Sequence, residues 1–423
     1  MKYIFQLALC ALLLAACSDN DSTHEPPAPP APIPGETPMP IAKRTVLIYC
    51  VAQNDLGISA WRNDSTEIAN GASFVGEDDR LLVYVDDARL PRLYLFTAET
   101  DAQLVYQWAD DRYSTNPEQL KSVVQRVAQY FPAEEYGLVC WSHSDGWLPS
   151  TNTDYSMSPM GFGIDVGANG SMNSNYDTHG KMGSQMNISA MAKAIEESGT
   201  HFRYIFFDSC LMQCIESCFD LRYATDYVVA SPMPIPYDGA YYTHMIEDGL
   251  FADSVERIAD TYFHDVSTMT TLYDDYGLVI STVKTDELNA LAATIKGALA
   301  SINWDATYPD MEEVDCYYRY LYDYYYRPHY YDLQSSIKHL CSASDYEVVC
   351  QQLSKVVSNM KATPRFWVGP YYNNYAYIDT DNCCGISMFV PQEAYARNAH
   401  LCIYGNHNET YKQTEWARAI GKN

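Results

Sequence analysis

The chain has 423 residues, with 54 acidic against 27 basic side chains and a formal net charge of −27 at pH 7. So acidic a chain repels nucleic acid and anionic lipid surfaces, which excludes a nucleic-acid-binding protein. Its length is sufficient for one large hydrophobic core or two of ordinary size. The 13 cysteines are scattered, many of them in apolar strand-like runs, so they indicate buried thiols rather than a disulfide scaffold.

Residues 1–16 predict a secretory signal peptide. Lys2 precedes an apolar stretch from Ile4 to Leu14, which is too short to span a membrane, and small residues follow before Cys17. The ending "LAAC" resembles a bacterial lipobox, which implies lipidation of Cys17; an ordinary secretory signal is the alternative. The acidic "SDNDS" after Cys17 is similar to the surface-export signals of some Gram-negative lipoproteins. We therefore expect an outer-membrane lipoprotein that faces the medium, with the periplasmic face as the alternative.

Residues 17–42 are expected to form an extended tether. The run "HEPPAPPAPIPGETPMP" is rich in proline and nearly without bulky apolar side chains. From Lys43 onward, short apolar runs alternate with longer amphipathic ones. This pattern predicts strands at 45–52, 80–87, 93–98, 136–141, 204–208 and 227–231, and helices from about 60 and at 116–131, 187–198 and 211–223.

Continuous apolar strands separated by amphipathic helices predict an α/β fold, in which helices cover both faces of a mostly parallel sheet. We assign residues 43–282 to this domain and 283–423 to a helical and mixed extension packed on it. The tyrosine-dense part of the extension favours packing on helix faces over a carbohydrate-stacking platform. Residues 148–186 are rich in Gly, Ser, Asn and Met and have no clear period, which is typical of a functional loop.

Two of the predicted strands each present a reactive side chain at the carboxyl end, where ligands gather in parallel sheets. "GLVCWSHSDGW" presents His143, and "YIFFDSC" presents Cys210. A thiol must lose its proton to attack a carbonyl, and a nearby imidazole or the N-terminus of the helix expected directly after Cys210 would lower its pKa. The pair predicts nucleophilic catalysis; a structural histidine and an inert thiol are the alternative.

The ordered motifs "LVCWSHSDGW", "FFDSCLMQCIE" and "YVVASPMPIPYDGAYY" resemble the clostripain family of cysteine peptidases, in the clan that includes caspases and gingipains. The resemblance runs from about Lys43 to the C-terminus. It implies a caspase-like α/β sandwich and an endopeptidase that cuts after Arg or Lys with a Cys–His dyad. His143 would be the general base and acid and Cys210 the nucleophile, with the N–H groups of Ser144 and Cys210 as the oxyanion hole. Family members often have Gly where this chain has Ser144.

Asp208 and Asp238 match the two acidic positions with which the family lines its primary specificity pocket, where carboxylates attract guanidinium or ammonium groups. A helix N-terminal acid for Asp208 and a helix cap for Asp238 are the local alternatives. Several members are activated by a cut in the loop between the His and Cys segments. Lys181 is the one Lys or Arg between residues 147 and 186, which predicts self-processing there; a solvated loop lysine is the alternative.

No metal site is assigned, and no cofactor is expected to be required. Cys210, Cys214 and Cys218 extend too far along a helix to converge on one ion, so the last two are expected to pack in the core. Clostripain itself uses calcium, but the acidic clusters at 77–79 and 86–87 lack EF-hand spacing, so calcium is left unassigned. Two rival functions stay open: a surface binding lipoprotein without turnover, and a peptidase of the same clan with another residue preference.

Overall fold

A computed structural model describes residues 34–87, 89–98, 100–148, 161–168, 174–268, 277–304, 306–318, 328–368, 377–397 and 406–423. The expected signal peptide, Cys17 and most of the tether lie outside these residues. In the part of the chain that the structure describes, no helix is long and apolar enough to cross a membrane.

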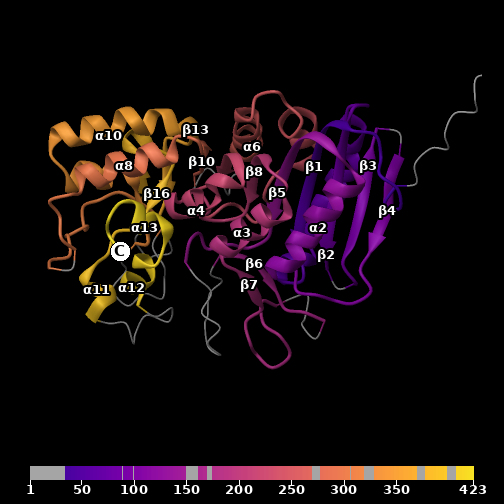
Figure 1. Ribbon diagram of the computed structural model, residues 1–423, viewed down its shortest axis with the longest axis horizontal. Coiled ribbons are helices and arrows are strands. Elements are labelled where there is room, and N and C mark those ends of the chain that lie inside the picture. The colour runs from indigo at the N-terminus through magenta and orange to yellow at the C-terminus, as the bar shows by residue number, and fades with distance from the viewer. Residues whose placement is uncertain are drawn as a thin grey trace, which may run out of the picture. The chain divides into compact units, whose positions relative to one another are not determined.

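The central sheet has nine strands in the order β13-β10-β9-β8-β5-β1-β2-β3-β4 (Figure 1). Its middle is parallel, and antiparallel strands flank it at both edges. The strands, in chain order, are β1 (Ala42–Val51), β2 (Asp79–Asp86), β3 (Arg92–Thr97), β4 (Thr100–Gln107), β5 (Ala133–Trp141), β8 (Phe202–Asp208), β9 (Thr225–Ala230), β10 (Val279–Lys284) and β13 (Val357–Ala362).

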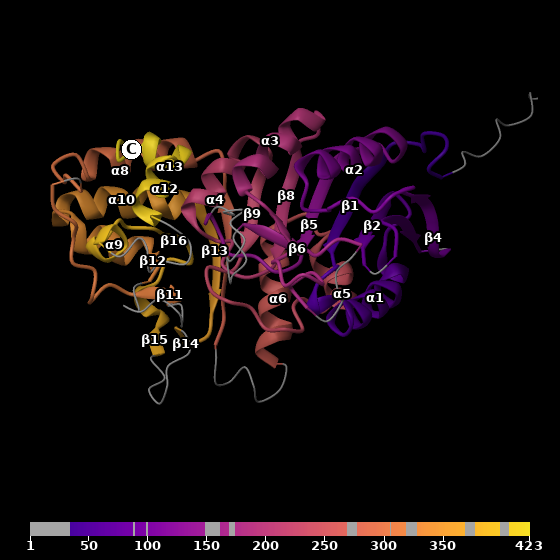
Figure 2. The same cartoon turned by 90° about the horizontal axis from the view of Figure 1, so that it is seen from below.

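Helices cover both faces of this sheet because its middle strands are apolar on both faces; β1, for example, is buried throughout from residue 44 to 51. One layer consists of α2 (Pro117–Tyr130), α3 (Ile188–Ser198) and α4 (Ile215–Asp220). The opposite layer consists of α1 (Ala60–Gly71), α5 (Tyr242–His244), which continues into η4 (Met245–Gly249), and α6 (Glu256–Thr268). Figure 2 shows the two layers on opposite sides. The predicted α/β sandwich with a mostly parallel sheet is confirmed.

The helix α2 begins where its sequence predicts. The side chain of Asn116 caps it by accepting a hydrogen bond from the N–H of Glu118. Pro117 occupies the first turn, where a missing N–H removes no helical hydrogen bond. Local sequence alone is enough to place this helix.

The helix after Cys210 starts later than predicted. It begins at Ile215 rather than at residue 211, and a 3-10 turn, η3 (Leu221–Tyr223), follows it. Leu211 has a φ of 63°, which lies outside the right-handed helical region. Its N–H donates to the carbonyl of Met233. Cys210 therefore lies in a turn and not at a helix N-terminus.

The loop at 148–186 contains two short strands that the sequence did not indicate, since segments so short show no period. β6 (Phe162–Asp165) and β7 (Ser184–Met186) pair antiparallel. The N–H of Gly163 donates to the carbonyl of His143, and the N–H of Asp145 donates to that of Gly161. The loop is thus attached to the strand end that carries His143.

The chain beyond residue 282 is part of the same compact unit as the sheet, which spans residues 33–423. The expected boundary after residue 282 falls inside β10, and β13 extends the central sheet. Tyr317, Tyr330 and Tyr331 are fully buried, as packing requires, but they lie on or beside short strands rather than on helix faces.

The remaining elements are η1 (Asp55–Gly57), η2 (Ala72–Phe74), α8 (Leu288–Ala298), β11 (Cys316–Tyr318), β12 (Tyr330–Asp332), α9 (Leu333–Leu340), α10 (Ala343–Val356), β14 (Arg365–Trp367), β15 (Tyr377–Asp379), η5 (Thr380–Asn382), β16 (Ser387–Met388), α11 (Glu393–Arg397), α12 (His407–Lys412) and α13 (Glu415–Ala419).

Candidate active site

The sheet brings His143 and Cys210 together. β5 and β8 are neighbouring parallel strands, and their last residues, Trp141 and Asp208, are register partners. His143 follows the first strand and Cys210 the second, so both lie at the same edge of the sheet. Both line one cavity of about 230 Å³, together with Trp141, Asp208, residues 235–237 and Gly239. We call this cavity the cleft.

The thiol of Cys210 needs a base. Desolvation of the thiol raises its pKa to about 11, and the charges of Asp145 and Asp208 act in the same direction. One hydrogen bond opposes them, since Sγ accepts the N–H of Ile235 at 3.4 Å. The helix α4 begins too far along the chain to lower this pKa, contrary to the expectation from sequence. At neutral pH the thiol in this arrangement is therefore protonated.

The imidazole of His143 lies in the cleft beside the carboxylate of Asp55. The imidazole is 26 % exposed, and its Nε2 lies 2.6 Å from Oδ1 of Asp55. Because an ionised carboxylate can only accept, Nε2 carries the proton, which leaves Nδ1 as the ring nitrogen able to accept one. Both residues are described, and no hydrogen bond joins the imidazole to the thiol in this state. Such bonds often tighten only when substrate is bound.

Asp55 was missed in the sequence. It lies in η1, directly beyond the carboxyl end of β1, which is the other neighbour of β5. "VLIYCVAQND" therefore has the same design as the His143 and Cys210 segments, a buried strand followed by a polar side chain. That repetition is the signal that could have identified it.

Two backbone N–H groups beside the cleft were expected from sequence to form an oxyanion hole. In the described part of the chain, the N–H groups of Ser144 and Cys210 donate to no protein acceptor. The hydroxyl of Ser144 donates to the carbonyl of Cys210, which ties the two strand ends to each other. The hydroxyl of Tyr330, from the C-terminal part of the chain, donates to the carbonyl of Asp145 at 2.7 Å. The turn after His143 is thus held from both sides.

Asp208 contributes a carboxylate to the wall of the cleft. Its two oxygens accept the N–H of Ala240 at 3.1 and 3.2 Å, and Oδ2 accepts the hydroxyl of Tyr242 at 3.0 Å. Burial raises its pKa to about 6, and these two donors limit the rise. The alternative role as a helix N-terminal acid is not observed, because α4 begins only at Ile215.

Asp238 is exposed and lies between Tyr237 and Gly239, which both line the cleft. The structure does not include it in the lining itself. It does not cap a helix either, since α5 begins at Tyr242 with Tyr241 in the N-cap position.

Two further acids behind the cleft were not found from the sequence. Asp64 accepts the indole N–H of Trp141 at 2.6 Å, and Glu67 accepts the N–H of Tyr242 at 2.9 Å. Burial raises the pKa of Asp64 to about 9 and that of Glu67 to about 6, and the charge of Asp208 adds to both shifts. Both lie on α1, where they look like ordinary polar positions of an amphipathic helix.

Lys181 lies on an exposed turn. Its N–H donates to Oδ1 of Asp177 at 2.8 Å, and the N–H of Asp177 donates back to its carbonyl at 2.8 Å. Residues 149–160 and 169–173 of the same loop lie outside the described residues. The turn is thus a short, closed segment at the surface.

Side chains that commonly bind metal ions do not cluster among the described residues. None of them forms a group of three or more His, Cys, Asp or Glu side chains able to hold a metal ion. Cys214 and Cys218 are fully buried in the core. Asp87 is paired with Arg89 and Arg92, and burial together with the charge of Asp165 raises the pKa of Asp86 to about 9.

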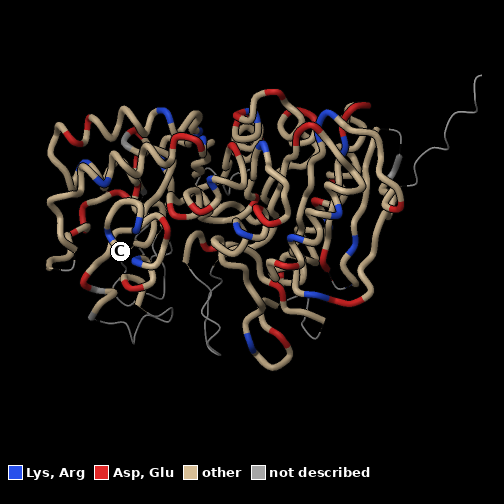
Figure 3. The backbone as a smooth tube through the Cα atoms, in the orientation of Figure 1, with Lys and Arg blue, Asp and Glu red and all other residues tan. Residues whose placement is uncertain are grey.

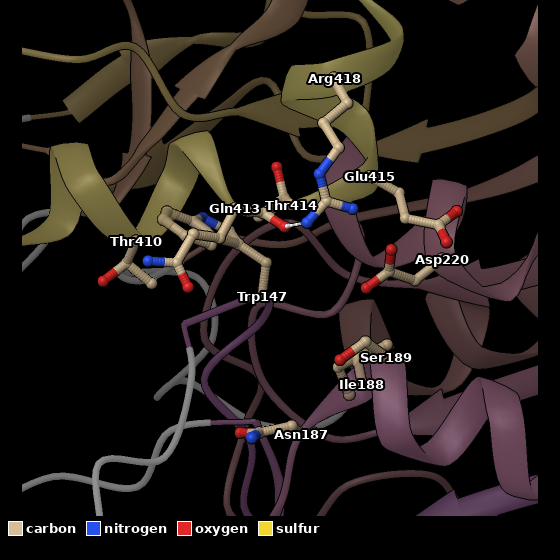
Figure 4. A pocket seen from close by; sticks show the side chains of 10 residues that line it. All are labelled: Trp147, Asn187, Ile188, Ser189, Asp220, Thr410, Gln413, Thr414, Glu415 and Arg418. Atoms are coloured by element: carbon tan, nitrogen blue, oxygen red, sulfur yellow. Dashed lines mark hydrogen bonds between the residues drawn. The ribbon is translucent and has the colours of Figure 1, made fainter. Parts of the chain in front are cut away.

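A larger cavity, of about 430 Å³, lies elsewhere (Figure 4). It is lined by Trp147, the first turn of α3, Asp220 of α4 and the α12–α13 region, with Glu415 and Arg418. It contains no cysteine and no histidine. A thiol and an imidazole therefore line the smaller cleft and not this cavity.

Charge is distributed over the whole described backbone. In Figure 3, Asp and Glu residues occur along most elements and outnumber Lys and Arg. The Lys and Arg positions are scattered along the backbone in that view and do not gather in one segment.

Comparison with known proteins gives consistent matches. Residues 48–422 match the family model described as the clostripain family. The structure of a secreted C11 cysteine protease from Bacteroides thetaiotaomicron, in complex with an irreversible peptide inhibitor, is 26 % identical with a TM-score of 0.71, over 90 % of this chain and 99 % of that one. An inactive zymogen C11 protease from Parabacteroides distasonis is 27 % identical with a TM-score of 0.71, over the same shares. No curated protein matches the chain. The structural matches confirm the predicted caspase-like fold class.

Proposed function

The chain belongs to the clostripain family of cysteine peptidases and is an endopeptidase of that family, and on this premise we propose that it cleaves after Arg or Lys with a Cys210–His143 dyad. The observation that carries the proposal is the cleft. One cavity is lined by a thiol, an imidazole and a carboxylate, on two neighbouring strand ends.

The proposed reaction begins when Nδ1 of His143 takes the proton of the Cys210 thiol. The thiolate attacks the scissile carbonyl carbon, and the N–H groups of Ser144 and Cys210 stabilise the oxyanion. The C–N bond breaks as the imidazolium gives its proton to the leaving amine. Water, deprotonated by His143, then hydrolyses the thioester and restores the thiol.

The preference for a basic residue is proposed from the charge around the cleft. A carboxylate offers about four acceptor sites, and the contacts of Ala240 and Tyr242 with Asp208 leave capacity for a donor from the cavity. Asp238 at the rim and Glu67 behind add negative potential. A guanidinium or ammonium group would be attracted there, and an acidic side chain rejected.

A second candidate preference has an observation of its own. Asp208 is only 3 % exposed, and the hypothetical Cβ of Gly239 would lie 2.9 Å from both carboxylate oxygens. The carboxylate thus also holds the segment 239–242 in place. If that is its whole role, the enzyme prefers uncharged residues.

Labelling with peptidyl chloromethyl ketones that end in Arg, Lys or an uncharged residue separates the candidates. We expect the Arg or Lys reagent to alkylate Cys210, located by peptide mapping, and Cys210→Ala to remain unlabelled. Adduct with the uncharged reagent alone would support the other preference. Absence of any adduct on Cys210 would support the rival function, a binding lipoprotein without turnover.

We also propose that Lys181 is a self-processing site, supported by its exposed turn and by the existence of a related C11 zymogen. In the wild type, a denaturing gel should show two fragments, one that begins at Cys17 and one that begins at Met182, the second identified by N-terminal sequencing. Cys210→Ala should stay whole, and Lys181→Ala should stay whole as well. Cutting of Cys210→Ala alone in buffer would contradict self-processing.

Cys17 is proposed as the lipid anchor that attaches the protein to the outer membrane, facing the medium. The basis is the "LAAC" sequence alone. Cys17→Ser should move the protein from the membrane fraction to the soluble fraction. Protease shaving of intact cells should remove the wild type if it faces the medium and should spare it if it faces the periplasm.

A further inference from the structure

Asp55 connects the imidazole of His143 to the loop that carries Lys181. One carboxylate oxygen, Oδ1, contacts Nε2 of His143 at 2.6 Å. The other, Oδ2, accepts the side-chain N–H of Asn175 at 3.2 Å, and the backbone N–H of Asp55 donates to Oδ1 of Asn175 at 3.4 Å. Asn175 therefore holds Asp55 at two points while Asp55 holds the ring.

Asn175 is itself fixed by the turn that follows it. Its carbonyl accepts the N–H of Gly183 at 2.9 Å, and Tyr176 and Met182 form an antiparallel bridge. These contacts close the segment 175–183 on itself. The carboxamide of Asn175 is thus presented to Asp55 by a closed hairpin rather than by a free loop.

We propose that Asp55 is a positioning residue for His143, and that Asn175 keeps Asp55 in place. Asp55 fixes the tautomer in which Nδ1 accepts the thiol proton, and its charge stabilises the imidazolium that forms when Cys210 ionises. The inference rests on the proposed dyad, because it assigns a role only to a histidine that exchanges a proton with Cys210.

The molecule contains a second Asp–His pair, away from the cleft, with which the pair of Asp55 and His143 can be compared. Nε2 of His201 lies 2.7 Å from Oδ1 of Asp226, with side chains 52 % and 58 % exposed. The pair at the cleft is less exposed, at 26 % for His143 and 42 % for Asp55. Neither His201 nor Asp226 lines the cleft. Asp226→Asn is therefore a matched control, because it also removes one carboxylate charge from an Asp–His hydrogen bond.

Because Asp55 is partly exposed, we expect its replacement to leave the protein folded. Burial acts to raise the pKa of Asp55, but the hydrogen bonds with His143 and Asn175 outweigh it and hold that pKa below its ordinary value. The carboxylate is therefore charged throughout the range in which a cysteine peptidase works. Replacing it with the near-isosteric amide removes the charge and keeps the volume.

The test is the alkylation of Cys210 by iodoacetamide as a function of pH, in purified wild type, Asp55→Asn, Asp55→Glu, Asn175→Ala and Asp226→Asn. This small neutral reagent needs no peptide recognition, so it reports on the thiol alone. At pH 7 we expect Asp55→Asn to react about tenfold more slowly, with its half-maximal rate at about one pH unit higher, because an adjacent charge shifts such equilibria by about one unit or more. Asp55→Glu should recover part of the rate, Asn175→Ala should lose about threefold, and Asp226→Asn should match the wild type.

Alkylation of Asp55→Asn with the rate and pH dependence of the wild type would overturn the proposal. So would an equal slowing in Asp226→Asn, which would mean a general effect of net charge. Loss of peptide hydrolysis in Asp55→Asn with unchanged alkylation would also overturn it. A wild type that shows the Asp55-dependent alkylation but cleaves no Arg or Lys peptide would contradict the proposed specificity while supporting this inference.

Discussion

The molecule uses histidine in two contrasting ways, in the cleft and in the core of the C-terminal part. In the cleft, His143 is partly exposed and bonded to a carboxylate. In the C-terminal core, His329 and His407 are each 1 % exposed and bonded to each other at 2.6 Å, among the rings of Phe389 and Tyr395. Burial lowers the pKa of His407 to about 4 and that of His329 below its ordinary value.

On the proposed mechanism, the surroundings, and not the residue type, decide which histidine takes part in catalysis. A ring next to a carboxylate and a thiol can gain and lose a proton. A ring sealed among aromatic side chains stays neutral, because burying its charge is costly. Cysteine divides in the same way, between Cys210 in the cleft and Cys214 and Cys218 in the core. Substitutions should therefore affect chemistry in one region and stability in the other.

The largest effect is expected for Cys210→Ala. Removing the nucleophile should lower kcat/KM for a fluorogenic Arg peptide by about 10⁴-fold or more, with little change in Tm. Cys218→Ala, a deletion of the same size in the buried core, should keep kcat/KM within about twofold and lower Tm. A comparable loss of activity in a folded Cys218→Ala would contradict the division between a catalytic cysteine in the cleft and a structural one in the core.

Asp208→Asn should give the next largest effect. If the carboxylate receives a basic side chain, kcat/KM for Arg peptides should fall by roughly 10²-fold, since removing one partner of a buried charge pair costs about 2–5 kcal/mol. Hydrolysis of a peptide with an uncharged residue before the scissile bond should change little. Equal losses for both substrates would mean that Asp208 only supports the segment 239–242.

Lowering the pH should have an effect similar to that of Asp208→Asn, because it neutralises the same carboxylate. Burial raises the pKa of Asp208 to about 6, so the carboxylate is ionised above that pH and neutral below it. Binding of a cationic side chain is therefore retained above pH 6 and lost as the pH falls through it. Between pH 7 and pH 5 the KM for an Arg peptide should rise about tenfold, whereas the KM for an uncharged peptide should stay nearly constant.

His407→Gln should leave the chemistry unchanged and alter only stability. Free histidine titrates near 6.5 and the folded His407 near 4, so the unfolded chain takes up the proton first as the pH falls. Folding stability from this group is thus complete above about 6.5 and is lost as the pH falls toward 4. Urea unfolding at several pH values should show a shallower pH dependence in the variant over this window. A changed kcat/KM would show that the two regions are coupled.

The sequence predicted the strands and the two reactive side chains because both depend on local pattern. Runs such as "VLIYCVA" and "YIFFD" are apolar throughout and end in polar residues, so each strand end can be located without knowing its neighbours. The same holds for α2, whose cap and first turn are fixed by Asn116 and Pro117.

What the sequence did not predict depends on contacts between distant segments. Asp55 reaches His143 only because β1 lies beside β5. The local sequence of these two segments does not predict the order of the strands in the sheet. The late start of α4 follows from the bond between Leu211 and Met233 and from a left-handed backbone that leucine rarely adopts. Asp64 came close to the cleft only through the packing of α1 on the sheet.

The central claim is that Cys210 and His143 act as one unit, and a double-mutant cycle tests it most directly. The kcat/KM of Cys210→Ala, His143→Ala and the double variant should be measured on one Arg peptide, at one pH and with folding verified. Residues that act as a unit are strongly non-additive, so each single variant should lose about as much activity as the double variant. A His143→Ala enzyme with near wild-type activity would contradict the account.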